Sequence, residues 1–217
     1  MIKTSIILAA GRGDRMKPLT DYVPKSLIKC HGRSLINWSI DAIRKDSDKI
    51  YVTYGYKADQ LLPEIYNLVD GLINTTNKGN SYFLFNSPIQ SINTPVVIIP
   101  CDSIIEYHIN LLYDEFMESN VACMIVPIDT NIDECDRIQF NSDTYNVTSI
   151  GRTVESNISS SGLQILNPLR INELMGEQEN FIDIWQNLIK LNELKISTNK
   201  LRVFKTFDTM QQLDNSY

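Results

Sequence analysis

Mainly apolar runs of strand length alternate with amphipathic segments over the first 130 residues. The strongest are TSIILAA (4–10), TPVVIIPCDS (94–103) and VACMIVPI (121–128), and each ends at polar or glycine positions. Runs of this kind are typical of strands that are buried on both faces of a parallel sheet. KIYVTYG (49–55) and the shorter GLINTT (71–76) are expected to be two further strands.

Three segments between these strands have helical periodicity. In 34–45, Ile36, Ile40 and Ile43 follow the spacing i, i+4, i+7, which predicts a crossover helix. Segment 58–69 is expected to be helical, with Pro63 either kinking it or marking a break. Segment 105–119 is also amphipathic and helical, whereas 81–89 fits a strand or a helix equally well.

Beyond about residue 137 the segments become shorter and richer in strands. RIQFN, YNVTSI and SSSGLQILN are expected strands, followed by helices at 168–175 and 180–192 and a final strand at 202–208. This order predicts an α/β fold: a Rossmann-like, open, mostly parallel mixed sheet flanked by helices, with a small β-rich lobe. We expect a single domain over 1–217.

Composition narrows the class of protein. The 217 residues contain 20 Lys and Arg against 26 Asp and Glu, a net charge of −6, which argues against a general nucleic-acid or membrane-surface binder. No apolar stretch approaches the ~20 residues of a membrane span. The four cysteines are scattered without metal-ligand spacing, so we expect reduced thiols in a cytoplasmic protein.

The loop after the first strand is positively charged, although the chain as a whole is negatively charged. Residues 11–25 contain four cations but only two acids: Arg12, Arg15, Lys17 and Lys25 against Asp14 and Asp21. In open α/β sheets, ligands bind beyond the carboxyl ends of the strands, so this loop and the turn at 100–103 are expected to face one cleft. The loop fits neither the dinucleotide fingerprint nor the Walker motif, because Met16 stands at the third glycine position.

A longer sequence motif that includes the two glycines is more specific for a protein family than the glycines by themselves. It is L-A-A-G-x-G-x-R-M-x-P-L-T followed by V-P-K-S-L-I, and it resembles the signature of nucleoside-triphosphate-dependent sugar nucleotidyltransferases. The similarity extends more loosely over the chain, through SSGLQILNP (160–168), FIDIW (181–185) and FKTFDTMQQL (204–213). It is closest to short forms such as N-acetylmuramate-1-phosphate uridylyltransferase and phosphocholine cytidylyltransferase.

The resemblance implies a role for each matched residue. Residues 1–130 would bind the nucleotide, and 131–217 would bind the acceptor and supply a second metal ligand. Arg15, Lys25 and Asp102 would be catalytic, whereas we expect Lys17 to be solvated. The nucleotide would contact the first loop and a later segment, through Leu8, Ala9, Ala10, Gly11, Gly13, Asn80 and Ser81.

The resemblance also implies Mg²⁺, a hard cation that prefers carboxylate oxygen. Asp102 is the expected first ligand and Asp208 the second, with Asp183 as the alternative second ligand. Two departures from the family pattern are Cys101, where glycine is usual, and Thr209-Met210 in place of a glycine-containing turn.

The implied reaction is transfer of a nucleotidyl group from a nucleoside triphosphate to a phosphorylated acceptor, with release of pyrophosphate. A phosphomonoester has a second pKa of about 6, so it needs little help from a base, and the two histidines, His31 and His108, have no catalytic setting. Within the resembled family, Asn80-Ser81 with Leu84 is nearer to the cytidylyltransferases, so the resemblance favours CTP over UTP or dTTP. A sugar 1-phosphate is the first choice of acceptor. A phosphorylated amino alcohol is the second, because Trp185 is either a cation–π partner or a core aromatic, and segment 131–138 adds only Arg137.

Two other classes stay open. A metal-dependent glycosyltransferase would share the sheet, but it would normally have D-x-D where this chain has Cys101-Asp102-Ser103. A nucleotide-sensing subunit would share the fold without the reaction. The expected partners are a nucleoside triphosphate and a small phosphorylated acceptor, with no nucleic acid and no membrane. The oligomeric state stays open, because the resembled family includes monomers, dimers and tetramers.

Overall fold

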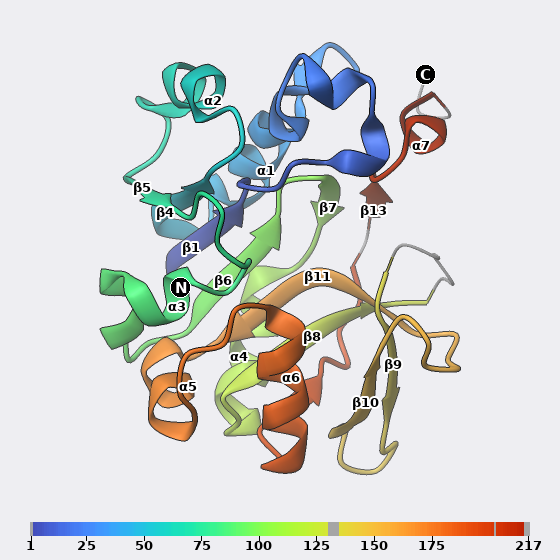
Figure 1. The fold of residues 1–217 in the computed structure, drawn as a ribbon. Helices are drawn as coiled ribbons and strands as arrows, with labels where there is room; N and C mark the ends of the chain where they lie inside the picture. Colours follow the sequence, from blue (N-terminus) through green and yellow to red (C-terminus); the bar gives the residue numbers. More distant parts are fainter. Residues whose placement is uncertain (1, 130–134, 202, 215–217) are drawn as a thin grey trace.

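The computed structural model describes residues 2–129, 135–201 and 203–214, and its centre is a nine-stranded mixed sheet (Figure 1). Its main strand order is β10-β9-β11-β6-β1-β4-β5, with β8 beside β11 and β12 beside β8. These strands are β1 (Ile2–Leu8), β4 (Ser47–Tyr54), β5 (Gly71–Asn74), β6 (Val96–Pro100), β8 (Cys123–Ile128), β9 (Arg137–Phe140), β10 (Val147–Gly151), β11 (Ser159–Leu166) and β12 (Leu194–Ile196). The predicted α/β class and mostly parallel mixed sheet are confirmed.

Helices cover both faces of the sheet. They are α1 (Leu35–Arg44), α2 (Ala58–Ile65), α3 (Phe83–Asn86), α4 (Ile109–Ser119), α5 (Pro168–Leu174), α6 (Phe181–Lys190) and α7 (Met210–Asp214). Among the described residues, no helix is long and apolar enough to cross a membrane.

Neighbouring residues of β1 serve opposite layers of the core. Ile7 packs with residues of α1, α2 and α4, whereas Ile6 packs with residues of α3, α5 and α6. Successive side chains of a strand point to opposite faces, so a strand covered on both faces is apolar throughout. That is why TSIILAA is a continuous apolar run rather than an alternating one.

Most predicted elements are present, and several boundaries differ. Segment 81–89 is helical, as α3 followed by a 3₁₀ turn at Pro88–Ser91. The second helix ends at Ile65, and Pro63 lies inside it. The predicted helix at 105–119 was wrong at its start, because β7 (Ser103–Glu106) is a strand and α4 begins at Ile109.

Residues 103–106 form a strand and not the start of a helix because of a contact with a distant segment. β7 pairs antiparallel with β13 (Val203–Thr206), forming a separate two-stranded sheet. Ile105 is buried in this arrangement and packs into the core beside α1. An apolar residue at position 105 fits the buried face of a helix or of a strand, so the sequence pattern could not distinguish the two elements.

The β-rich second half continues the central sheet. β11 pairs antiparallel with β6 and with β8, and β9 and β10 follow at the edge. The strand β12, which the sequence pattern did not indicate, pairs parallel with β8. The division of the chain at residue 130 stays a prediction.

Candidate active site

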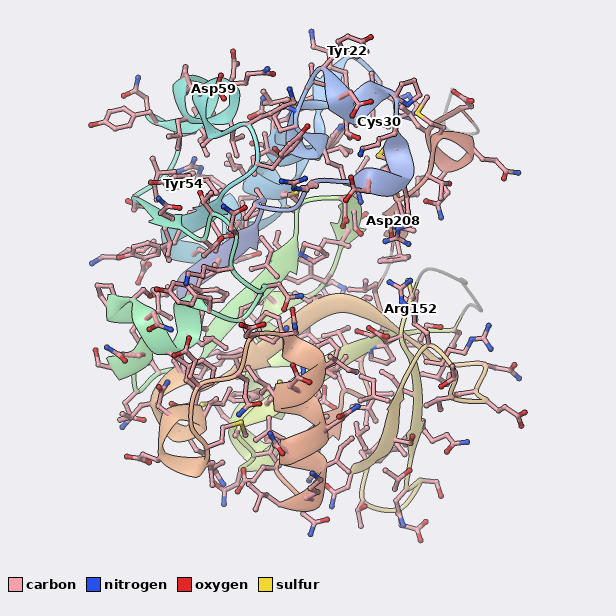
Figure 2. The ribbon with its side chains drawn as sticks, in the orientation of Figure 1. Tyr22, Cys30, Tyr54, Asp59, Arg152 and Asp208 are labelled. Atoms are coloured by element: carbon pink, nitrogen blue, oxygen red, sulfur yellow. The ribbon has the colours of Figure 1, made fainter. Side chains whose placement is uncertain are left out.

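The glycine loop begins where β1 ends at Leu8, and a small apolar cluster fixes its far end. Met16 is fully buried and packs with Phe207 and Leu213 from the end of the chain. Because Met16 follows Arg15 and Phe207 precedes Asp208, this cluster brings the loop cation beside the late acid. Figure 2 shows Asp208 close to the loop that follows β1.

A compact ionic cluster lies at this junction. The Lys25 ammonium donates to Asp102 Oδ2 and to Asp208 Oδ1, each at 2.6 Å. The Arg15 guanidinium donates to the same Asp208 oxygen at 2.9 Å. The structure therefore brings these four residues into one cluster, although Arg15 and Asp208 are 193 positions apart in the sequence.

Backbone pairing of β7 and β13 holds the two acids in register. Ser103 pairs with Thr206, and the Phe207 amide donates to the Asp102 carbonyl at 2.9 Å. Asp102 and Asp208 are thus attached to adjacent, hydrogen-bonded strand ends. The position of Asp208 depends on β7, whose last two residues the sequence analysis assigned to a helix.

Burial and charge act in opposite directions on Lys25. Its side chain is 10% exposed, and burial by itself would lower the pKa of the ammonium. The charges of Asp102 and Asp208 and their hydrogen bonds raise the pKa above the ordinary 10.5. Lys25 is therefore positively charged throughout the neutral range. Beside it, burial raises the pKa of the Cys101 thiol to about 12, so this cysteine stays a protonated packing residue.

Gly13 leaves room for the Lys25 side chain. Its φ is +68°, a left-handed conformation, and a Cβ there would lie 2.9 Å from Lys25 Cβ. We expect Gly13→Ala to lower the free energy of unfolding by about 1–2 kcal/mol for the backbone conformation alone, and to displace Lys25 in addition. Denaturant unfolding and turnover measure the two effects.

Gly32 supplies the matched control for this substitution. It has a φ of +76°, but no atom lies within 4 Å of a Cβ built there. Gly32→Ala should therefore reproduce the backbone cost and leave turnover unchanged. Equal turnover of the two variants would contradict the role assigned to the contact between Gly13 and Lys25.

A cavity of about 290 Å³ opens beside Asp102 at the carboxyl ends of β1 and β6. Five of the predicted site residues line it: Leu8, Ala10, Gly11, Asn80 and Asp102. Thr53 and Thr75, which the sequence analysis did not identify, also line it. They follow from the topology, because β4 and β5 are the next strands beyond β1 and end at the same edge.

Several predicted residues lie outside this cavity. Ala9 is buried, and its amide donates to the Thr53 carbonyl at 3.2 Å. Ser81 is fully buried, and its hydroxyl donates to the Gln178 carbonyl at 2.8 Å, which makes its side chain a structural contact. Arg15, Lys25 and Gly13 do not line the cavity. Lys25 binds Asp102, which does line it, whereas Arg15 binds Asp208, which lines the second cavity instead. Asp183 lies in the first turn of α6 and lines neither of the cavities that contain Asp102.

A second cavity, of about 140 Å³, lies on the other side of Asp102. It is lined by both acids of the ionic cluster and by Asp136, Ser160 and Trp185. Trp185 is mostly a core residue: it stacks on Phe181 at 5.9 Å and donates from Nε1 to the Gln164 side chain at 3.0 Å. Asp136 was missed by sequence reasoning. Arg137, its neighbour, is in β9, and residues 131–134 of the predicted segment lie outside the described residues.

Asp136 and Trp185 also line a larger adjoining hollow of about 430 Å³, with Arg152, Asn180 and Gln186. Burial raises the pKa of Asp136, although the nearby charge of Arg152 opposes the shift. Figure 2 shows Arg152 on the side of the molecule that carries Asp208. This hollow shares Asp136 and Trp185 with the second cavity and therefore continues from it.

The two acids fit the ligand set of Mg²⁺. Both Asp102 and Asp208 present a carboxylate oxygen to the same ammonium nitrogen, so the two oxygens face one common position. Within the part of the chain that the structure describes, no group of three acids, histidines or cysteines forms a metal cage. Two carboxylates completed by water and substrate phosphate are the usual arrangement for Mg²⁺.

The comparisons with known proteins agree with this architecture. Residues 5–132 match the model of the MobA-like NTP transferase domain, more than half of the 217 residues. The chain belongs to the MobA-like NTP transferase family. The predicted relationship to nucleotidyltransferases is thereby confirmed, and with it the enzyme class.

Curated relatives match this chain over short stretches. The bifunctional IPC transferase and DIPP synthase of Aquifex aeolicus is 44% identical over 52 residues, which are 24% of this chain and 12% of that protein. N-acetylmuramate alpha-1-phosphate uridylyltransferase of Neisseria meningitidis is 49% identical over 41 residues, 19% and 18% of the two chains. Choline-phosphate cytidylyltransferase of Streptococcus pneumoniae is 37% identical over 57 residues, 26% and 25%. The matched segments therefore span a quarter or less of these relatives.

Solved structures match over nearly the full length. The inositol-1-phosphate CTP transferase from T. maritima has a TM-score of 0.79 at 16% identity, covering 98% of this chain and 91% of that chain. A UDP-glucose pyrophosphorylase complexed with UDP-glucose has a TM-score of 0.76 at 15% identity, covering 100% and 97%. At this identity the likeness establishes the fold.

Proposed function

We propose that this protein transfers a nucleotidyl group from a nucleoside triphosphate to a phosphorylated acceptor, a sugar 1-phosphate, and releases pyrophosphate. The observation that carries the proposal is the ionic cluster of Arg15, Lys25, Asp102 and Asp208 between two cavities that share Asp102. The product would be an activated sugar for surface glycan or related biosynthesis. Such an enzyme would work in the cytoplasm, where nucleoside triphosphates are supplied.

The two cavities suit the two substrates. The cavity next to the glycine loop offers backbone groups of Ala10 and Gly11 and the polar side chains of Thr53, Thr75 and Asn80 to a nucleotide. The cavity beyond Asp102 continues into the hollow lined by Asn180 and Gln186, whose amide groups can bind sugar hydroxyls. The α-phosphate of the nucleotide and the acceptor phosphate would then meet at Asp102.

In the proposed reaction, an acceptor phosphate oxygen attacks the α-phosphorus in line. The bond from the α-phosphorus to the bridging oxygen breaks, and pyrophosphate leaves with the electron pair. No side chain needs to remove a proton, because the acceptor phosphate is mostly dianionic at neutral pH. Lys25 and Arg15 contribute by positioning the phosphates and compensating their charge. Mg²⁺, held by Asp102 and Asp208, would supply further charge compensation to the phosphate oxygens.

Asp136 favours a phosphorylated amino alcohol as the alternative acceptor. Its carboxylate lines the second cavity together with the indole of Trp185, and an ammonium group can interact with both an acid and an aromatic face. Arg152 lines the same hollow, and its positive charge opposes this choice. The sugar phosphate therefore remains the first proposal.

Pyrophosphate release tests the proposal. We expect Mg²⁺-dependent release when CTP, UTP or dTTP is combined with one member of a panel of sugar 1-phosphates. If pyrophosphate is released with phosphocholine or phosphoethanolamine and with none of the sugar 1-phosphates, the amino-alcohol alternative is established. Nucleotide binding without release for any acceptor would indicate a sensing protein, and consumption of a nucleoside diphosphate sugar would indicate a glycosyltransferase.

A further inference from the structure

The loop between β5 and α3, residues 75–82, lines two separate spaces. Lys78, Gly79 and Asn80 line the cavity of about 290 Å³ beside the glycine loop, which we call the nucleotide cavity. Asn80 also lines the hollow of about 430 Å³ that continues from the second cavity, which we call the acceptor hollow. The start of α6 lines the same hollow, through Asn180, Phe181, Trp185 and Gln186.

This loop is hydrogen-bonded to the segment that begins α6. The Phe181 amide donates to the Asn80 side-chain oxygen at 2.9 Å. The Ser81 amide donates to the Glu179 carbonyl at 3.1 Å, and the Ser81 hydroxyl donates to the Gln178 carbonyl at 2.8 Å. Three hydrogen bonds therefore join two segments that are about a hundred residues apart in the chain.

The two segments are also in direct backbone contact. A Cβ built at Gly79 would lie 1.8 Å from the Glu179 carbonyl oxygen. Within the described part of the chain, every hydrogen bond of residues 76–82 with a distant segment ends on 178–181. Because the segments are bonded together and leave no space for a methyl group, one segment cannot shift without displacing the other.

Asn80 supplies α6 with a cap that the helix itself does not provide. The first amides of a helix have no partner within the helix. Asn180, the residue before α6, makes no side-chain hydrogen bond to them, whereas Asn80 accepts from the Phe181 amide. The Phe181 ring contacts the rings of Phe83 and Trp185, with centroids 6.2 and 5.9 Å away. The position of Asn80 therefore affects how α6 presents Trp185 to the acceptor hollow.

We propose that the loop 75–82 couples the two substrate sites. A nucleotide bound against the loop fixes it, and the contacts of Asn80 and Ser81 then fix the start of α6 in the position that binds the acceptor. Both are positioning residues for the acceptor, because they act on it through α6. The assignment of the two substrates to these spaces rests on the proposed function. Such coupling is reciprocal, so the acceptor should tighten nucleotide binding by the same factor.

Hydrogen exchange measured by mass spectrometry tests the coupling without the reaction. CTP, UTP and dTTP are each added with Mg²⁺ and without acceptor. In the unmodified protein, a nucleotide that protects residues 76–82 should also slow exchange in 178–185 by about 5-fold or more, the lower end of usual coupling between sites. In Asn80→Ala and in Ser81→Ala, saturating nucleotide should still protect 76–82, but the nucleotide-dependent slowing in 178–185 should be lost.

Steady-state kinetics give a second readout. Ser81 is fully buried and lines neither space, so Ser81→Ala removes a contact to Gln178 without removing a contact to substrate. At saturating nucleotide, this variant should raise the KM for the acceptor by about 5-fold, within the range that one hydrogen bond contributes to an equilibrium. Its kcat should change by less than about 2-fold. A merely structural defect would instead lower the fraction of active protein, and therefore kcat, at unchanged KM.

Asn167→Ala is the matched control. The Arg170 amide donates to the Asn167 side-chain oxygen at 3.1 Å, so this variant also removes an asparagine cap, from α5. Asn167 lines neither the nucleotide cavity nor the acceptor hollow. The variant should lose stability as Asn80→Ala does, yet keep the nucleotide-dependent protection of 178–185 and the KM for the acceptor.

The outcomes separate the coupling from the proposed reaction. If nucleotide protects 76–82 of the unmodified protein and leaves 178–185 unchanged, the coupling is absent whether or not the protein turns over. Identical behaviour of Ser81→Ala and Asn167→Ala also overturns it. If protection spreads to 178–185 but no phosphorylated acceptor supports turnover, the coupling stands and the proposed reaction fails. If none of the three nucleotides binds, both fail.

Discussion

Replacing Lys25 by alanine is expected to lower turnover by about 10²–10³-fold or more, which is the scale of losing one preorganised electrostatic contact. The ammonium donates to Asp102 and Asp208 at the boundary between the two cavities, where the α-phosphate and the acceptor phosphate are proposed to meet. The readout is the initial rate of pyrophosphate release at saturating substrates.

The same substitution should also destabilise the protein. It leaves two acids close together and mostly buried, with Arg15 as their remaining cation, and breaking a buried ion pair costs about 3–5 kcal/mol. Denaturant unfolding of the variant and of the unmodified protein at pH 7 measures this loss of stability.

Lys25→Met separates the two effects, because methionine keeps the apolar stem that packs beside Gly13 and removes only the charge. Both variants should lose activity to a similar extent, measured where circular dichroism shows them folded. A folded Lys25→Met protein with the turnover of the unmodified protein would falsify the role assigned to the ammonium.

Asp102→Asn is expected to reduce turnover by about 10²–10³-fold, and added Mg²⁺ should not restore it. Asparagine keeps the size of the side chain but loses the charge that a hard cation requires. Asp102 is also the acid that both cavities share, and its side chain is 25% exposed, so it is accessible to substrate. The measurement is the initial rate as a function of Mg²⁺ concentration.

Asp208→Asn and Asp183→Asn decide between the two hypotheses for the second metal ligand. Asp208 binds Lys25 and Arg15, so its replacement should reduce turnover and raise the Mg²⁺ requirement. Asp183 lies in α6 and makes no contact with this cluster among the interactions described, so Asp183→Asn should behave like the unmodified protein. The reverse pattern would move the second ligand to α6 and contradict the arrangement proposed here.

Much of the fold could be predicted from local patterns. Continuous apolar runs located β1, β6 and β8, and the spacing of Ile36, Ile40 and Ile43 located α1. These predictions succeeded because burial on both faces of a sheet, or on one face of a helix, imposes a distinct period on the chain. The short strands β7 and β12 were missed, because three or four residues are too few to show a period.

The candidate site divides in a similar way. The family resemblance singled out Arg15, Lys25, Asp102 and Asp208, which the structure brings into one cluster. It did not identify Asp136 or Arg152, because their significance depends on which cavities they line. Ser81 shows the opposite error: it lies beside Asn80 in sequence, yet its hydroxyl is directed to the Gln178 carbonyl.

The sequence by itself determined the family, the positions of the buried strands along the chain and the cations of the glycine loop. All three can be recognised from residues that are close together in the sequence. Only the tertiary structure decided that Asp208 meets Asp102 and that Asn80 meets the start of α6. Both depend on contacts between segments far apart in the chain: the pairing of β7 with β13 and the hydrogen bonds between residues 80–81 and 178–181. Local periodicity contains no information about such contacts, because the free energy that forms them comes from packing between segments and not from either segment alone.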